Sequence, residues 1–206
     1  MKNYKFYLSD IDADTSLKNA SSIAVDGEFS GLNPLTDKLH LLQLCDNSEF
    51  VHLIKFEGPY NAPNLKEILQ NSKIKKIFHF GRADLGFLNQ HLNIKVKNIF
   101  DTKIASKIGR KFTNCHGLRD LCRDLININL SKEYQTSDWG KKIQEYTEEQ
   151  ITYACKDVLY LHKIRDELEK ILKRENKYDL AEQCFKFLET RIELDLKGLT
   201  GDIFEH

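Results

Sequence analysis

An apolar run that ends in carboxylates constrains the fold of this chain more than any other feature. Residues Ser22-Ile23-Ala24-Val25 have the composition of a buried central strand and lead directly into Asp26-Gly27-Glu28. Because side chains alternate along a strand, Asp26 and Glu28 share one face. Unpaired carboxylates in a buried setting are costly, so the fold must supply partners for them.

Two later blocks repeat this combination of buried structure and acid. Asp84 follows the β-rich segment 74–80, in a helix that begins just after it. Tyr153 and Asp157 are four residues apart, so a helix places them on one face. Clustered carboxylates commonly hold divalent cations, and two such ions about 4 Å apart form the usual apparatus for cutting phosphodiester bonds.

The three blocks together predict a metal-dependent nuclease site. Asp26, Glu28, Asp84 and Asp157 would hold two Mg²⁺ or Mn²⁺ ions, hard cations that prefer oxygen ligands. One ion of such a pair activates water and the other stabilises the leaving 3′ oxygen. Tyr153 would orient the attacking water, because a phenol with a pKa of about 10 is a poor base. Each block taken alone has a plainer interpretation, since solvated carboxylates at strand ends are common.

The remaining pattern predicts a single α/β domain over residues 1–206, with a mixed central sheet flanked by helices. The expected strands are 22–26, 39–44, 49–54, 74–80 and 96–100. The expected helices are 61–71, the one carrying Asp84, 102–108, 117–125, 147–174 and 178–196, with an irregular stretch over 127–140.

Composition argues against several other classes of protein. Five cysteines without a Cys-x-x-Cys pair disfavour a disulfide framework and a zinc site, and Cys155 is expected to fill a helix interior. No stretch approaches the ~20 apolar residues of a membrane span, and no signal peptide is evident, so we expect a cytoplasmic protein.

Net charge is a weak guide to partners here. The formal net charge is zero, but residues 95–123 hold eight basic side chains against two acidic ones. Such a stretch follows a phosphate backbone in some proteins and is a solvated helical face in others. Both interpretations stay open from the sequence.

Four ordered stretches carry a family resemblance: Val25-Asp26-Gly27-Glu28, His79-Phe80-Gly81-Arg82-Ala83-Asp84, Gln135-Thr136-Ser137-Asp138-Trp139 and Tyr153-Ala154-Cys155-Lys156-Asp157-Val158. They resemble the motifs of the DEDD superfamily of 3′–5′ exonucleases, in the ribonuclease D-like subgroup with tyrosine in the last motif (DEDDy). Four more stretches are similar to the compact alphaproteobacterial enzymes termed nanoRNase C: Lys76-Ile77-Phe78-His79-Phe80, Thr102-Lys103-Ile104-Ala105-Ser106, His116-Gly117-Leu118 and Cys184-Phe185-Lys186-Phe187-Leu188-Glu189-Thr190-Arg191.

The resemblance implies a ribonuclease H-like fold and dependence on two divalent ions. It also implies hydrolysis of short single-stranded RNA, dinucleotides included, to 5′-mononucleotides, and a homo-oligomer, which is an octamer in that family. Gly27 departs from the family pattern, which commonly has threonine there, and we expect that position to point away from the metals. The short stretch after Asp157 leads us to expect no C-terminal helical nucleic-acid-binding module.

Four residues are candidates for substrate contact, each with an alternative. Leu32 matches the position where short-RNA exonucleases place an apolar wedge between the last two bases of the substrate; alternatively, it packs internally. His79 contacts phosphate or base, or is a core histidine. Arg82 reaches a phosphate or braces a metal-binding carboxylate. His116 contacts a phosphate or caps the helix that follows it. Two further residues are expected to be structural: Asp101 as a helix cap rather than a fifth metal ligand, and Trp139 as a packing residue.

Two other functions stay open from the sequence. The same metal cage would cut DNA, and no residue is seen that reads a 2′-hydroxyl group. A catalytically inactive nucleic-acid-binding module is the other alternative. The presence of all four carboxylates and the tyrosine argues against that module.

Overall fold

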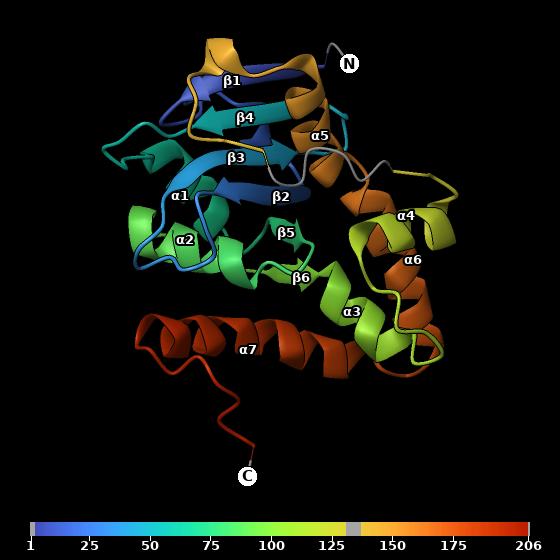
Figure 1. The fold of residues 1–206 in the computed structure, drawn as a ribbon. Helices are drawn as coiled ribbons and strands as arrows, with labels where there is room; N and C mark the ends of the chain where they lie inside the picture. Colours follow the sequence, from blue (N-terminus) through green and yellow to red (C-terminus); the bar gives the residue numbers. More distant parts are fainter. Residues whose placement is uncertain (1–2, 131–136, 206) are drawn as a thin grey trace.

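The computed structural model describes residues 3–130 and 137–205, and its centre is a six-stranded sheet in the order β1-β4-β3-β2-β5-β6 (Figure 1). The strands are β1 (Tyr4–Leu8), β2 (Ser22–Phe29), β3 (Leu39–Cys45), β4 (Val51–Lys55), β5 (Lys75–Phe78) and β6 (Ile99–Asp101). The helices are α1 (Pro63–Gln70), α2 (Arg82–Leu92), α3 (Thr102–Gly109), α4 (Leu118–Ile126), α5 (Glu148–Leu159), α6 (Leu161–Arg174) and α7 (Tyr178–Leu196), with short 3₁₀ turns at Ser16–Asn19 and Ile143–Glu145.

Strand directions confirm the predicted mixed sheet. β3 runs antiparallel to both of its neighbours, β2 and β4, whereas the β1–β4, β2–β5 and β5–β6 pairs are parallel. β1 lies outside the predicted strands, because an edge strand with alternating burial has a weak sequence signal. Residues 131–136 of the predicted irregular stretch, which include Gln135 and Thr136 of one family motif, lie outside the described residues.

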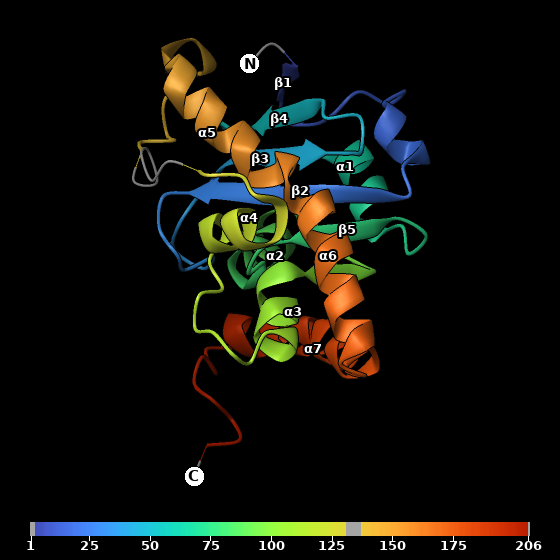
Figure 2. The ribbon, with the colours of Figure 1, turned by 90° about the vertical axis from the view of Figure 1, so that its right-hand side faces the viewer.

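Helices cover both faces of the sheet (Figures 1 and 2). Val25 of β2 packs into the core beneath α1 and α2, and the preceding Ala24 packs into the core beneath α4, α5 and α6. Both side chains are fully buried, as expected of a central strand. α7 runs along the β6 edge and contributes to both cores, which protects that edge from pairing with another chain.

The predicted single helix over 147–174 is wrong, because the chain forms two helices that meet at Tyr160. Thr147 and Gln150 form a capping box at the start of α5. α5 then packs on β2, β3 and β4, whereas α6 packs mainly on α3 and α4 and makes fewer contacts with β2, β5 and α7. The two helices therefore follow different partners, and the bend comes from tertiary packing rather than from a proline or glycine.

The turn between β5 and α2 positions one wall of the candidate site. β5 ends at Phe78, two residues earlier than predicted, and Gly81 caps α2. The Asp101 carboxylate accepts hydrogen bonds from the N–H groups of Gly81 (2.8 Å) and Ile104 (2.9 Å). Asp101 is therefore a helix cap, as predicted, and it also ties α3 to the turn. Within the described ranges, no helix has the length and apolar character needed to span a bilayer.

Candidate active site

Three of the predicted carboxylates meet where β2 passes beneath α5. Asp26 and Glu28 follow Ala24 by two and four residues, so they lie on the face of β2 that α5 covers. Asp157 comes from α5 itself. Oxygen atoms of these three side chains lie within 4.8 Å of one another, close enough to share a metal ion.

Asp84 approaches the group from the first turn of α2, on the other side of β2. Its carboxylate is buried, and Oδ1 has no hydrogen-bond partner. A Cβ atom at Gly27 would lie 3.1 Å from this oxygen. The expectation that position 27 points away from the metal-binding groups is therefore wrong, since it points away from Asp26 and Glu28 but toward Asp84.

Burial raises the pKa of every one of these carboxyl groups, and repulsion between them adds to the rise for Glu28, Asp84 and Asp157. Burial raises the pKa of Asp26 to about 7. Burial also raises the pKa of Glu28, and the charges of Asp26, Asp157 and Asp84 add to the rise. For Asp84 and Asp157, burial raises the pKa first and the charge of Asp26 raises it further. The four groups thus form a desolvated acidic cluster that cations would stabilise.

The donor set fits hard divalent cations. All the candidate ligand atoms are carboxylate oxygens, and the buried, unpartnered Oδ1 of Asp84 is an orphan that an ion would satisfy. Gln43, which the sequence did not single out, donates from Nε2 to Glu28 (3.3 Å) and holds that carboxylate from the neighbouring strand β3. Its signal would have been a polar residue within the apolar run from Leu41 to Cys45.

Tyr153 lies one helical turn before Asp157, as the four-residue spacing predicts. Burial raises the pKa of its hydroxyl above the ordinary value, and the nearby acidic charges raise it further. The phenol therefore stays protonated and is suited to donating a hydrogen bond. The Trp139 ring, whose centre lies 6.3 Å from that of Tyr153, is buried, so its predicted packing role is confirmed. Cys155 is also fully buried, as expected of a helix interior.

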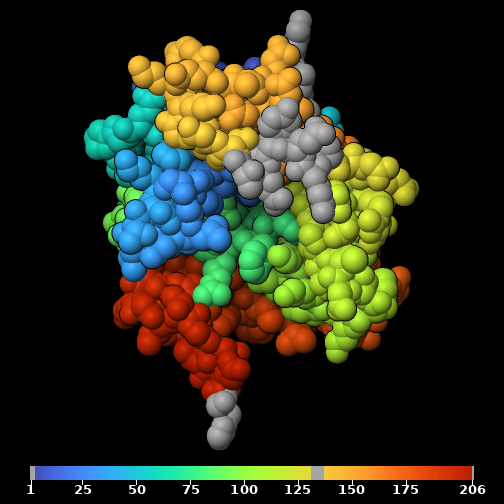
Figure 3. Space-filling model, viewed as in Figure 1, coloured from blue at the N-terminus to red at the C-terminus, as the bar shows by residue number. Residues whose placement is uncertain are grey.

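A hollow of about 480 Å³ opens over the carboxylates, and the surface is visibly recessed between the blue β2–β3 segment and the yellow-green α3–α4 segment (Figure 3). Asp26, Tyr153 and Asp157 are among the residues that line it. Phe80 and Lys103 line it as well. The α4 end contributes Gly117, Leu118, Arg119 and Asp120.

A second hollow, of about 850 Å³, adjoins the first. Phe80 lines both, and Leu32 and Arg82 line the second. Leu32 is 83% exposed, so the alternative that it packs internally is wrong and the wedge role stays a prediction.

Arg82 has a partner that the sequence did not suggest. Its guanidinium donates from Nε and Nη2 to the two carboxylate oxygens of Asp195 on α7, at 2.7 Å each. It thereby ties α2 to the last helix instead of bracing a metal-binding carboxylate. Contact with a substrate phosphate stays a prediction.

The two candidate histidines have different surroundings. His79 shares a hydrogen bond between Nδ1 and Thr102 Oγ1 (2.9 Å), and burial lowers its pKa to about 3. A neutral ring of this kind agrees with the core-histidine interpretation, although His79 also lines the first hollow. His116 is bonded through Nδ1 to Ser106 Oγ (2.8 Å), and Gly117 is the N-cap of α4. The capping alternative for His116 is therefore wrong.

The basic stretch 95–123 does not act as one surface. Lys103 and Arg119 line the first hollow together with Asp26 and Asp157. Lys95 and Lys97 instead form ion pairs with glutamates of α7, and Arg110 is buried against Asp124. A phosphate-binding role thus remains open for Lys103 and Arg119, and most of the other basic residues are engaged elsewhere.

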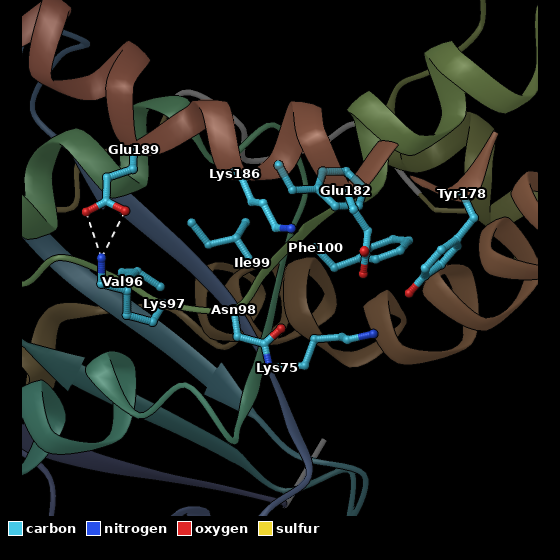
Figure 4. Close-up of a pocket in the computed structure, with 11 residues that line it drawn as sticks. Lys75, Val96, Lys97, Asn98, Ile99, Phe100, Tyr178, Glu182, Lys186 and Glu189 are labelled. Atoms are coloured by element: carbon cyan, nitrogen blue, oxygen red, sulfur yellow. Dashed lines mark hydrogen bonds and ion pairs between the residues drawn. The ribbon is translucent and has the colours of Figure 1, made fainter. Parts of the chain in front are cut away.

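A separate hollow of about 220 Å³ lies between α7 and the starts of β5 and β6 (Figure 4). It lies at the opposite end of these parallel strands from His79. Lys97 in its wall is paired with Glu189 at 2.7 Å, and Lys75 is paired with Glu169. Because these cations are already neutralised, the carboxylate hollow is the stronger candidate for chemistry.

A protein family and several known proteins match most of this chain in sequence. Residues 12–173 match the model of a family described as 3′–5′ exonuclease. The chain is 32% identical over 162 residues to the exosome complex exonuclease RRP6 of Saccharomyces cerevisiae, covering 78% of this chain and 21% of that protein. It is 26% identical over 163 residues to ribonuclease D of Gluconacetobacter diazotrophicus, covering 79% and 41%. The chain therefore spans less than half the length of these relatives.

Solved structures resemble the whole chain. Brucella melitensis NrnC bound to pGG has a TM-score of 0.93 and 40% identity, covering 99% of this chain and 98% of that one. NrnC of the same organism with bound Mg²⁺ has a TM-score of 0.92 and 38% identity, covering 99% of each chain. Escherichia coli RNase D has a TM-score of 0.77 and 24% identity, covering 86% and 46%. These likenesses confirm the predicted ribonuclease H-like fold and the resemblance to nanoRNase C.

Proposed function

This chain belongs to the 3′–5′ exonuclease family, and we propose that it hydrolyses short RNA oligonucleotides from the 3′ end, dinucleotides included, to 5′-mononucleotides. The observation that carries the proposal is the meeting of Asp26, Glu28 and Asp157 within 4.8 Å, with Asp84 beside them, under an open hollow. The similarity over the whole chain to a protein solved with pGG supports a substrate of that size.

The four carboxylates would hold two divalent cations, Mg²⁺ or Mn²⁺. Asp26, Glu28 and Asp157 have ligand oxygens close enough to share an ion, and Asp84 offers a buried oxygen without another partner. The Mg²⁺-bound relative supports this choice of ion. When bound, such ions lower the pKa of the attacking water and stabilise the leaving 3′ oxygen.

The chain's own side chains would position the reactants. Tyr153, kept protonated by its raised pKa, would donate a hydrogen bond that orients the attacking water toward the phosphorus. Gln43 fixes the Glu28 carboxylate through its 3.3 Å hydrogen bond, so that this ligand is preorganised. Lys103 and Arg119 would attract the phosphates of an entering strand into the hollow.

A nucleotide ladder tests the proposal. Purified protein is incubated with 5′-labelled RNA of about seven nucleotides, with DNA of the same sequence, and with a diribonucleotide, in Mn²⁺ and in EDTA. We expect stepwise shortening of RNA from the 3′ end, full conversion of the diribonucleotide, and no product in EDTA. Faster hydrolysis of DNA would favour the DNA exonuclease. The absence of product from every substrate would favour an inactive binding module.

Assembly is proposed from the same resemblance. We expect several copies to associate, eight in the family that the chain resembles, and sedimentation velocity of the purified protein measures this directly. A monomer that retains full activity would contradict the proposed assembly without affecting the proposed chemistry.

A further inference from the structure

A bulky residue adopts an unfavourable backbone conformation at the rim of the candidate site. Phe80, in the turn between β5 and α2, has a φ of 61°, in the left-handed region that side chains other than glycine rarely adopt. Strain of this kind persists only where the surrounding structure enforces it, and it concentrates at functional sites.

The neighbouring contacts hold the turn from both ends. The Gly81 N–H donates to Asp101, whose carboxylate is 1% exposed and also caps α3. His79 is bonded to Thr102, and a Cβ atom at Gly81 would lie 2.7 Å from side-chain atoms of Phe78. Because the backbone is fixed on each side of Phe80, the strained φ is built into the fold.

The Phe80 ring gains little from burial in return. It is 50% exposed, and it is the wall shared by the carboxylate hollow and the second hollow. The ammonium group of Lys103 lies 4.0 Å from the ring centre, a cation–π contact that fixes the orientation of the ring. Lys103 lines the carboxylate hollow but not the second hollow, so Phe80 borders the second hollow without this lysine beside it.

We propose that the exposed ring of Phe80 stacks on a nucleobase of the substrate seated in the second hollow. The inference rests on the proposed exonuclease function and adds a specific substrate-binding residue to it. Every nucleobase has a flat π face that can stack on a phenyl ring, so such a contact does not depend on which base is present. The exposed Leu32 side chain lines the same hollow. Leu32 and Phe80 thus give this hollow an apolar surface for a base, next to the hollow that holds the carboxylates. Lys103, on the other side of the ring, faces the hollow where the phosphate is cut.

The experiment compares Phe80→Ala with Phe80→Tyr on a normal diribonucleotide and on two analogues, each lacking one base. On the normal substrate we expect Phe80→Ala to raise KM about tenfold, the effect of losing one base–aromatic stack, while kcat stays within about twofold. Phe80→Tyr, which keeps the ring, should behave as the wild type does. With one of the abasic analogues, wild type and Phe80→Ala should show the same KM, because the base that stacks is missing.

A third variant distinguishes the loss of stacking from a loss of stability. Phe80→Gly adopts a positive φ without strain, so we expect its Tm to exceed that of Phe80→Ala while its KM rises equally. An active wild type whose KM is unchanged by Phe80→Ala, or changed equally on all three substrates, would overturn the stacking role alone. A wild type that cleaves no RNA would overturn the proposed function and, with it, this inference.

Discussion

Gly27 of β2 leaves room for the Asp84 carboxylate, because a Cβ atom at residue 27 would lie 3.1 Å from Oδ1 of Asp84. Asp26 and Glu28 face α5, whereas residue 27 faces the side from which Asp84 enters. A glycine at this position therefore leaves room for a carboxylate from one face of the sheet to approach the acids on the other.

Gly27→Ala should disturb the site through this contact. The added methyl would also lie 2.7 Å from Cζ of Phe29, so the Phe29 ring or the Asp84 carboxylate must move. We expect about a tenfold loss of kcat and weaker Mn²⁺ binding, since ligands displaced by an ångström are costly to catalysis. Gly201→Ala, with no atom within 4 Å of the new methyl, is the control. An equal kcat for the two variants would show that the close approach of Asp84 to residue 27 does not matter for catalysis.

The metal-free protein should lose stability as the pH rises. Burial raises the pKa of Asp26 to about 7, above its unfolded value of about 3.8, so the folded state binds this proton more tightly. The resulting stabilisation is complete below about pH 4 and is lost as the pH rises through about 7. We therefore expect the Tm in EDTA to fall over this range and to recover when Mg²⁺ is added.

Two variants test the assignment of that pH dependence. Asp26→Asn cannot ionise, so its Tm in EDTA should fall less between pH 4 and pH 8 than that of the wild type. Asp14→Asn, which changes an exposed acid, should follow the wild-type curve. If Asp26→Asn shows the wild-type fall, the buried acidic cluster is not its source.

Tyr153→Phe should slow the reaction without changing its pH profile. Burial raises the pKa of the Tyr153 hydroxyl, so the phenol does not titrate in the working range and acts as a hydrogen-bond donor. We expect kcat to fall about 100-fold through misplacement of the attacking water, with Mn²⁺ affinity retained. Tyr160→Phe, at the junction of α5 and α6, is the matched control. An alkaline limb present in the wild type and absent in Tyr153→Phe would indicate a base instead.

The Arg82–Asp195 ion pair should stabilise α7 rather than bind substrate. The pair is bidentate, and Asp195 also accepts from Arg191. Because the Arg82 side chain is 40% exposed, solvent screening limits its worth to about 1 kcal/mol, or ~2–4 °C in Tm. Arg82→Met and Asp195→Asn should lower Tm alike. The predicted phosphate contact requires a rise in KM for Arg82→Met alone, and an unchanged KM in both variants would limit Arg82 to the ion pair.

Local patterns predicted the parts of the site that depend on one element. The two-residue spacing of Asp26 and Glu28 and the four-residue spacing of Tyr153 and Asp157 each placed a pair on one face, as the structure confirms. Asp101 capped its helix for the same reason: the capping geometry is encoded within a few residues.

Contacts between distant segments could not be predicted in this way. Arg82 pairs with a residue 113 positions later, and Gln43 reaches Glu28 only because β2 and β3 are neighbours. The break at Tyr160 carries no proline or glycine, since it follows from the different partners of α5 and α6. Such features depend on tertiary packing, which local patterns in a single sequence do not predict.

Titration calorimetry of Mn²⁺ into the metal-free protein, with a non-hydrolysable dinucleotide analogue bound, tests the metal site most directly. We expect two ions per chain for the wild type and loss of at least one in Asp84→Asn and in Asp157→Asn, each in a folded protein. Full two-ion binding by both variants, or no binding by the wild type, would contradict the assignment of these carboxylates to the metals.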